Sequence, residues 1–139
     1  MISEHLNSFL CNMNVLARQV ASKNNLSLSQ YYTLTNISSS GISMSKLSSI
    51  LGIDNSTLTR NVNILIKHSF LKKQQSSQDK REQVVLLSSK GLKISEKLDV
   101  DMEELLNKFI LDINEDYRQS FLDILEQLNW KMNCYINDL

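Results

Sequence analysis

Apolar residues recur at three- and four-residue steps along much of the chain, which is the period of amphipathic helices packed on a core. Residues 6–20 show this pattern and predict a first helix. Ser27 stands three residues before Gln30, a spacing typical of a capping box at the start of a second helix. Ser43 and Asp54 are predicted to cap two further helices, because a short polar side chain there accepts a hydrogen bond from the first turn. Across these three helices the positions expected to face inward are Tyr31, Leu34, Ile37, Leu47, Ile50, Leu51, Leu58, Val62, Leu65 and Ile66.

The period shortens to that of β-strands between residues 70 and 87. Residues 70–74 predict one short strand, and residues 82–87, richer in β-branched and apolar side chains, predict a second. The seven residues between them are all polar, and they end in Lys80 and Arg81. This region therefore predicts a β-hairpin with a protruding basic loop. After it, apolar stripes predict two long helices that reach the C-terminal end of the sequence.

These elements predict a mainly α fold with a small β-hairpin wing, arranged as a winged helix-turn-helix. Two helices joined by a tight glycine-containing turn, the second of them polar on its outer face, are the parts of a helix-turn-helix. The first and last helices carry more apolar surface than the small winged core can cover, which favours a dimer. We therefore expect a single intertwined domain with three regions: an N-terminal dimerisation helix in 1–24, a DNA-binding winged helix-turn-helix in 25–92, and C-terminal dimerisation helices in 93–139.

The formal net charge of zero conceals a strong segregation of charge. Residues 41–93 hold nine basic side chains and three acidic ones, whereas residues 94–139 hold four basic and eleven acidic ones. A basic middle beside an acidic end is typical of a protein that touches a polyanion with only part of its surface. The charge pattern therefore favours double-stranded DNA as the partner of the winged region.

The helix that begins after Asp54 has the outer face expected of a recognition helix. Short hydroxyl and amide side chains allow close approach to base edges, and Arg60 can bind a guanine edge or a phosphate. Lys72 and Lys73 are expected near phosphates, and the hairpin tip is expected to enter the minor groove. The predicted DNA-binding residues are Ser43, Lys46, Asn55, Ser56, Thr57, Thr59, Arg60, Asn61, Lys72, Lys73, Lys80 and Arg81. The Asp79 carboxylate is expected to orient the Arg81 guanidinium rather than to touch DNA.

Several other classes of function are not supported by the sequence. We find no nucleophile–base pair, phosphate-binding glycine loop or carboxylate pair with convincing spacing, so no catalytic residues, enzyme activity or cofactor are expected. His5 and His68 lack companions at metal-ligand spacing, so no metal site is expected. No apolar run approaches the length of a bilayer span, and the N-terminus lacks the pattern of a secretory signal. With only two distant cysteines, the expected location is the reducing cytoplasm.

At this level of detail the chain resembles the MarR family of transcription regulators. The residues that carry the resemblance form an ordered series through residues 26–30, 44–48, 51–60 and 65–67, and then through residues 70–73, the Asp79-Lys80-Arg81 motif of the wing, and residues 87–91. Three positions depart mildly from the family pattern: Ser69 replaces a usual glycine, Lys73 an arginine and Ser88 a threonine.

The resemblance implies a homodimer held by its first and last helices, with two winged lobes on a pseudo-palindromic operator whose half-sites lie about one helical turn apart. It also implies a repressor that responds to an effector. An anionic aromatic or another small ligand, bound between the dimer arm and the winged lobe, would act by favouring a lobe spacing that does not fit DNA.

Two alternatives remain open on the sequence alone. The first is an adaptor that keeps the winged fold but has lost DNA binding; it would be expected to have a neutral wing and recognition face. The second is an oxidant-sensing switch at Cys11, because some MarR-type proteins sense oxidants through a cysteine of the first helix that tyrosines of the second helix orient. Tyr31 and Tyr32 lie in the second predicted helix, but Cys11 is closer to them in sequence than such sensors lead us to expect. A buried structural thiol is therefore the favoured interpretation of Cys11.

Overall fold

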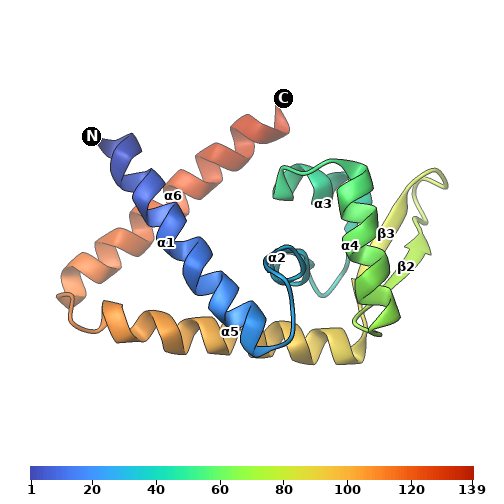
Figure 1. Cartoon of the computed structure of the whole chain (residues 1–139). Helices are drawn as coiled ribbons and strands as arrows, with labels where there is room; N and C mark the ends of the chain where they lie inside the picture. The colour runs from blue at the N-terminus through green and yellow to red at the C-terminus, as the bar shows by residue number, and fades with distance from the viewer. The chain divides into compact units, whose positions relative to one another are not determined.

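The structure, a computed structural model, describes residues 1–139 and divides into two compact units, Met1–Met102 and Glu103–Leu139. The boundary falls inside the fifth helix. The first unit contains α1 (Ile2–Lys23), α2 (Leu28–Thr35), β1 (Ile42–Ser43), α3 (Met44–Leu51), α4 (Asn55–Lys67), β2 (Leu71–Gln75), β3 (Gln83–Leu87) and the larger part of α5 (Ser89–Ile110) (Figure 1). The second unit contains the end of α5 and the whole of α6 (Glu115–Asn137). The mainly α fold with a small β-hairpin wing is confirmed.

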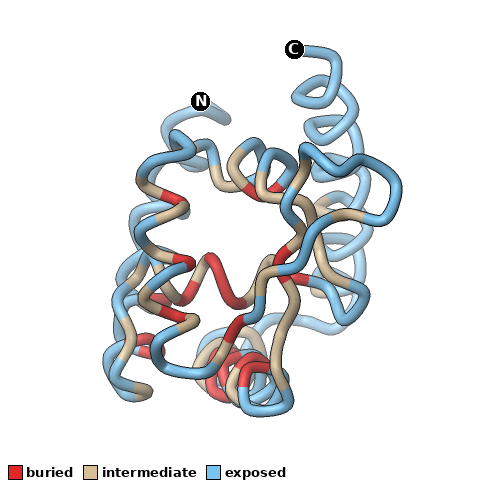
Figure 2. The backbone as a smooth tube through the Cα atoms, turned by 90° about the vertical axis from the view of Figure 1, so that its right-hand side faces the viewer, coloured by how far each residue is buried: buried red, intermediate tan, exposed pale blue.

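The core of the first unit lies among α2, α3, α4 and the sheet, with contributions from α1 and α5. Its fully buried side chains include Leu34, Leu47, Leu58, Leu65 and Leu98. Figure 2 shows buried segments on several elements of this unit, whereas the helix that ends at the C-terminus is exposed along almost its entire length. The predicted inward face of α4 is confirmed. One predicted core position is wrong: Ile50 is 47% exposed, because the short α3 buries little more than Leu47.

The three predicted caps are present, and they fix where α2, α3 and α4 begin. Ser27 and Gln30 form a reciprocal capping box. Ser43 Oγ accepts a hydrogen bond from the Lys46 amide at 3.2 Å, and Asp54 Oδ1 accepts one from the Thr57 amide at 2.8 Å. Since a cap specifies a helix start locally, these boundaries could be predicted from the sequence.

The sheet has three antiparallel strands in the order β1-β3-β2. Leu71 of β2 pairs with Leu87 of β3, and Gln75 pairs with Gln83, so the hairpin is regular up to its loop. The strand β1 was not predicted. It has only two residues, and Ser43 both pairs with Val84 of β3 and caps α3.

The turn between α4 and β2 contains a strained residue. Ser69 has a φ of +64°, in the left-handed region, and it is the position at which the MarR pattern has glycine. A side chain with a Cβ pays roughly 1–2 kcal/mol in this conformation, whereas glycine does not. Ser69 is also exposed, so a substitution there removes no core contact.

Replacing Ser69 with glycine is therefore expected to stabilise the fold. Relief of the backbone strain, less the greater flexibility of glycine in the unfolded chain, should raise the free energy of unfolding by about 0.5–1 kcal/mol. The expected increase in Tm is roughly 2–4 °C, which thermal unfolding followed by circular dichroism would detect. Asn25, at φ +57°, is the matched control, because asparagine tolerates this region and Asn25→Gly should gain less. A lower Tm for Ser69→Gly would contradict the strain assignment.

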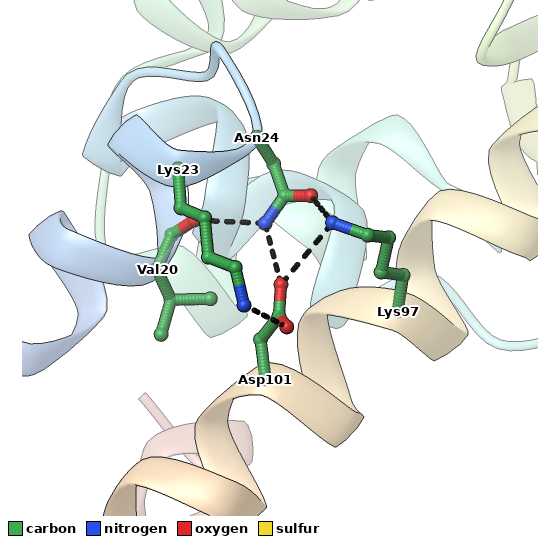
Figure 3. Close-up of polar contacts among 5 residues, drawn as sticks. All are labelled: Val20, Lys23, Asn24, Lys97 and Asp101. Carbon is green, nitrogen blue, oxygen red and sulfur yellow. Dashed lines mark hydrogen bonds and ion pairs between the residues drawn. The ribbon is translucent and has the colours of Figure 1, made fainter.

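A polar cluster joins the end of α1 to α5 (Figure 3). The side chain of Asp101 on α5 is only 8% exposed and accepts hydrogen bonds from Lys23 Nζ at 2.6 Å, Asn24 Nδ2 at 2.8 Å and Lys97 Nζ at 3.4 Å. Asn24 also donates to the carbonyl of Val20 at 2.9 Å, so it links the last turn of α1 to the carboxylate. The hydrogen bonds from Asn24 and Lys23 favour the charged form and lower the pKa of Asp101 to about 2.

This cluster should make stability depend on pH in the acid range. The pKa values of Asp101 and of the cap Asp54 are both lowered from 3.8 to about 2, so the unfolded chain binds protons more readily than the folded chain between these values. The stabilisation is complete above about pH 4 and should be lost as the pH falls towards 2. Urea unfolding of wild type and Asp101→Asn across this range is the measurement. The variant should be clearly less stable at pH 6, and the difference should vanish near pH 2. A difference that does not change with pH would contradict the role assigned to the ionised carboxylate.

The second unit is dominated by α6, a 23-residue helix with no buried residue. Asn114 caps it through a hydrogen bond from the Asp116 amide at 2.9 Å. Large apolar side chains nevertheless recur along it at three- and four-residue steps, and they are exposed in the single chain. They include Tyr117, Phe121, Ile124, Leu128, Met132 and Tyr135. No helix of the structure is both long and apolar enough to cross a bilayer.

Candidate nucleic-acid interface

The start of α4 and the hairpin together line an open hollow of about 480 Å³, which we call the wing hollow. The hairpin and α4 lie side by side in Figure 1. Asn55 and Thr59 contribute to the hollow from α4, and Lys73 and Arg81 contribute from the hairpin. Side chains of the predicted recognition helix and of the wing thus share one face of the first unit. The complete lining is Met44, Ser45, Asn55, Thr59, Lys73, Asp79, Arg81, Glu82 and Gln83.

The N-terminus of α4 is organised by the carboxylate of Asp54. Besides its bond from the Thr57 amide, it accepts the hydroxyl of Ser56 at 2.5 Å and that of Thr57 at 2.9 Å. These bonds, with the Ser56 hydroxyl contributing most, lower the pKa of Asp54 to about 2. The group is therefore a carboxylate, and purely an acceptor, at neutral pH.

This arrangement decides what two of the predicted DNA-binding residues can do. A hydroxyl group has one proton, and those of Ser56 and Thr57 are both directed to Asp54. Towards any other partner, both hydroxyl oxygens can therefore only accept hydrogen bonds. In a DNA major groove the matching donors are the N4 amine of cytosine and the N6 amine of adenine, not phosphate oxygens or the guanine edge.

Donors are supplied on the same face by cationic side chains. Arg60 lies one turn after Ser56 on α4, is exposed, and makes no hydrogen bond or ion pair within the chain. Lys46 on α3 and Lys72 on β2 are also exposed. Because these charges have no partners within the chain, they can bind phosphates or guanine edges without breaking an internal contact.

Two predicted DNA-binding residues also make internal contacts. Asn61 Nδ2 donates to Ser29 Oγ of α2 at 2.5 Å, which ties the middle of α4 to the neighbouring helix. Lys73 Nζ lies 3.4 Å from Asn63 Oδ1, so β2 is tied to α4. Both side chains hold α4 in place, in addition to any contact that they make with a ligand.

The wing loop is more ordered than its polar sequence suggests. Ser76 Oγ accepts from the amides of Gln78 and Asp79 at 3.2 and 3.3 Å, and the Ser76 amide donates to the Glu82 carbonyl at 2.9 Å. Lys80 and Arg81 are exposed at the tip of this loop, as predicted. Internal hydrogen bonds therefore present the two cations on a shaped loop.

Asp79 orients the wing by a different route from the one expected. Its Oδ1 accepts a hydrogen bond from the backbone amide of Arg81 at 2.9 Å, and no ion pair joins it to the Arg81 guanidinium. The carboxylate thus fixes the backbone that carries Arg81, and it leaves the guanidinium available. A short polar residue two positions before the amide that it binds is a common turn device, so the spacing alone could have indicated this role.

Two contacts of this face were not predicted. Ser45 Oγ on α3 donates to Glu82 Oε1 at 2.7 Å, and Asn63 Oδ1 accepts a hydrogen bond from Lys73 Nζ. Neither has a local signal in the sequence, because the partners are 37 and 10 residues apart and lie on different elements that come together only in the folded chain.

Cys11 lies on α1, away from these elements of the interface, and its exposure differs from the favoured expectation. It was expected to be buried, but in the single chain it is exposed, as is Cys134. The reason is that residues 2–12 of α1 are all exposed, and buried residues on this helix begin only at Ala17. Tyr32 does not orient the thiol: its hydroxyl donates to Asn14 Oδ1 at 2.7 Å.

Comparison with known proteins places this geometry in a family context. The family model described as MarR family matches residues 26–83, from the start of α2 to the start of β3. The resemblance to the MarR family is confirmed. Its members are transcription regulators and not enzymes, in agreement with the class expected from the sequence. The matched segment contains every residue of the wing hollow.

Solved MarR structures match almost the entire chain. Wild-type MarR from E. coli, in its apo form, is 18% identical with a TM-score of 0.79, and the match covers 92% of this chain and 96% of that one. A MarR transcriptional regulator from Methanosarcina mazei is 18% identical with a TM-score of 0.82, covering 96% and 97%. A cysteine-to-serine mutant of E. coli MarR in complex with operator DNA is 19% identical with a TM-score of 0.73, covering 91% and 92%. At these identities the matches establish a MarR-type fold. No curated protein sequence matches the chain.

Proposed function

We propose that this chain is a MarR-type transcription regulator that binds double-stranded DNA as a homodimer, with α4 in the major groove and the wing tip in the adjacent minor groove. The observation that carries the proposal is the shared face on which the polar side of α4 and the cationic wing line one hollow. A recognition helix needs an inner side packed on its own domain and an outer side free to enter a groove about 12 Å wide. The buried Leu58, Val62 and Leu65 supply the first, and Asn55, Ser56 and Arg60 supply the second.

The proposed contacts divide into two classes. We assign the reading of base edges to six residues of α4: Asn55, Ser56, Thr57, Thr59, Arg60 and Asn61. We assign contacts to the sugar-phosphate backbone and the minor groove to Ser43, Lys46, Lys72, Lys73, Lys80 and Arg81. The E. coli structure with operator DNA supports DNA binding by this fold, because the fold of this chain matches that protein in its DNA-bound state.

The homodimer is proposed from the exposed apolar surface at both ends of the chain. Residues 1–24 and 93–139 would form the dimerisation arm and residues 25–92 the DNA-binding lobe. A two-fold pair buries each exposed stripe against a second copy of the chain, and this removes the apolar side chains from water. Two lobes related by a two-fold axis imply a pseudo-palindromic operator with half-sites about one helical turn apart.

The finer regulatory features follow from the family resemblance and are proposed with it. They are repression in the cytoplasm and release of DNA when a small effector binds. An effector can act only if it binds more tightly to the conformation that does not fit the operator.

Selection of bound sequences from a random duplex pool, with the full chain, tests the proposal most directly. The expected outcome is an inverted repeat whose half-sites are about 10 base pairs apart, centre to centre. Within each half-site, one strand should carry an adenine or cytosine beside a guanine, so that its amine lies opposite the acceptor of Ser56 and the guanine edge lies opposite the donors of Arg60. Enrichment of no sequence, together with no retention on duplex DNA at low salt, would favour the adaptor alternative instead.

The oxidant-sensing alternative is separable by a single variant. An exposed Cys11 is accessible to peroxide, but no tyrosine hydroxyl is directed at it in the structure. Peroxide is therefore expected to leave operator binding unchanged in wild type and in Cys11→Ser alike. Release of DNA from wild type but not from the variant would establish the sensor.

A further inference from the structure

One hydrogen bond joins the wing loop to the helices of the first unit. Ser45 Oγ, in the first turn of α3, donates to Glu82 Oε1 at 2.7 Å. All the other hydrogen bonds of residues 76–82 stay within the hairpin. The orientation of the loop relative to α3 and α4 therefore depends on this contact and on the strands below it.

The sheet brings the two residues together. Ser43 of β1 pairs with Val84 of β3, so the start of α3 lies beside the start of β3, two residues from Glu82. Ser45 lies in the first turn of α3, whose start is fixed by the cap Ser43, and Ser43 Oγ lies 3.4 Å from Ser45 Oγ. The donor is thus fixed within α3, and the acceptor is half-buried in the wing hollow.

The charge of Glu82 is unfavourable for the activity proposed here. Its carboxylate lines the same hollow as Lys73 and Arg81, where it would repel the phosphates that those cations attract. A favourable contribution from Glu82 therefore has to come from geometry, and the bond to Ser45 is its only side-chain hydrogen bond.

We propose that Glu82 is a positioning residue for DNA binding: by accepting the Ser45 hydroxyl it holds the wing tip, with Lys80 and Arg81, at a fixed distance from the recognition helix. The inference rests on the proposed function, since it assigns the contact a role in engaging two grooves at once. Without the bond the wing tip would sample more orientations, and DNA binding would be weakened by the loss of conformational entropy when the tip is ordered.

The test compares two uncharged replacements of Glu82 in the full chain. Glu82→Gln keeps a carbonyl acceptor for Ser45, whereas Glu82→Ala removes it, so the loss of charge is the same in both. Ser45→Ala removes the donor, and Ser49→Ala is the matched control, because Ser49 bonds only within α3. Trypsin cleavage after Lys80 and Arg81, followed by mass spectrometry without DNA, reports the mobility of the tip. Cleavage after Lys67, at the end of α4, reports general unfolding.

Trypsin is expected to cut the wing tip roughly three- to tenfold faster in Glu82→Ala than in Glu82→Gln, and likewise faster in Ser45→Ala than in Ser49→Ala. The cleavage rate after Lys67 should not change. On the selected operator, Glu82→Ala and Ser45→Ala should each bind roughly three- to tenfold more weakly than Glu82→Gln. The double variant that combines Ser45→Ala with Glu82→Ala should bind no more weakly than either single variant. Glu82→Gln should bind at least as tightly as wild type, because the repulsion is removed and the contact is kept.

The outcomes separate the inference from the function on which it rests. If wild type binds an operator but Glu82→Ala matches Glu82→Gln in affinity, the positioning role is wrong and the proposed function stands. Additive losses in the double variant would also overturn it, because they would show that the two side chains act independently. If wild type binds no duplex at all, the proposed function fails, whatever the cleavage rates show.

Discussion

Raising monovalent salt from about 50 to about 200 mM is expected to weaken duplex binding by this protein by roughly a thousandfold. Each phosphate neutralised by a protein cation releases counterions, and log K falls with log salt by about 0.9 per phosphate. Neutralisation of about six phosphates by the proposed dimer, about three by each chain, gives a slope near −5. About half of the cations on the proposed face of each chain would suffice for this; they are Lys46, Arg60, Lys72, Lys73, Lys80 and Arg81.

Single replacements should show how much each cation contributes to the salt dependence of binding. Arg81→Ala is expected to reduce the salt slope by about one per protomer and to weaken binding to all duplexes similarly, because a wing contact to the backbone carries little sequence information. Arg60→Ala is expected to cost roughly ten- to a hundredfold for the selected operator, with a smaller loss on random duplex, because a bidentate contact to guanine is worth about 1–3 kcal/mol.

Fluorescence anisotropy with labelled duplexes at several salt concentrations measures both effects. Lys131→Ala, which removes an exposed cation from α6, is the matched control and should leave the slope unchanged. A slope near zero for wild type would mean that few phosphates are contacted, and it would direct attention to the adaptor alternative. A salt slope for Arg81→Ala equal to that of wild type would exclude the wing from the proposed interface.

The parts of this interface that the sequence predicted are those specified by neighbouring residues. A cap such as Asp54 acts on an amide three residues away, and the inward stripe of α4 follows from the helical period, so both are local. The hairpin was also predicted, with each strand misplaced by only one residue, because its alternation and polar loop lie within one short segment.

The parts that the sequence missed depend on pairing between distant segments. The strand β1 exists only because β3, some forty residues later, supplies its partner, and the bond from Ser45 to Glu82 follows from that pairing. Asp101 is one acid among eleven in its part of the sequence, and its burial becomes visible only when Lys23 and Asn24 approach from α1. Non-local contacts of this kind have no periodic signature that could identify them in advance.

The exposure of Cys11 in the single chain has a different origin. The apolar stripe of α1 favoured a dimerisation helix, and in the single chain only Ala17, Val20 and Ala21 are buried on it. A stripe indicates that a helix face needs a partner, and it does not indicate whether that partner belongs to the same chain. The same distinction applies with greater force to α6.

Introducing a charge on the apolar stripe of α6 is expected to dissociate the proposed dimer and, with it, to abolish tight operator binding. The 23 residues of α6 bury nothing in the single chain, and an isolated helix of this kind is marginal in water. Ile124 is 63% exposed, and Leu128, one turn later, is 38% exposed. Burial of such a side chain is worth about 1.5–3 kcal/mol, and a two-fold dimer buries it twice, so its replacement by aspartate should raise the dimer Kd by at least about a hundredfold.

Ile124→Asp and Leu128→Asp test this expectation, and Asn133→Asp adds the same charge on the opposite side of the helix as a control. Sedimentation velocity should show a monomer for the first two variants and a dimer for wild type and Asn133→Asp. Operator affinity should fall in parallel by roughly a hundredfold or more, because linking two half-site contacts in one molecule gives 10²–10⁴ in avidity. Circular dichroism at high protein concentration distinguishes dissociation from misfolding, since the first unit has its own core and should keep its helices. A variant that remains dimeric and binds the operator as wild type does would show that the stripe of α6 faces something other than a second copy of this chain.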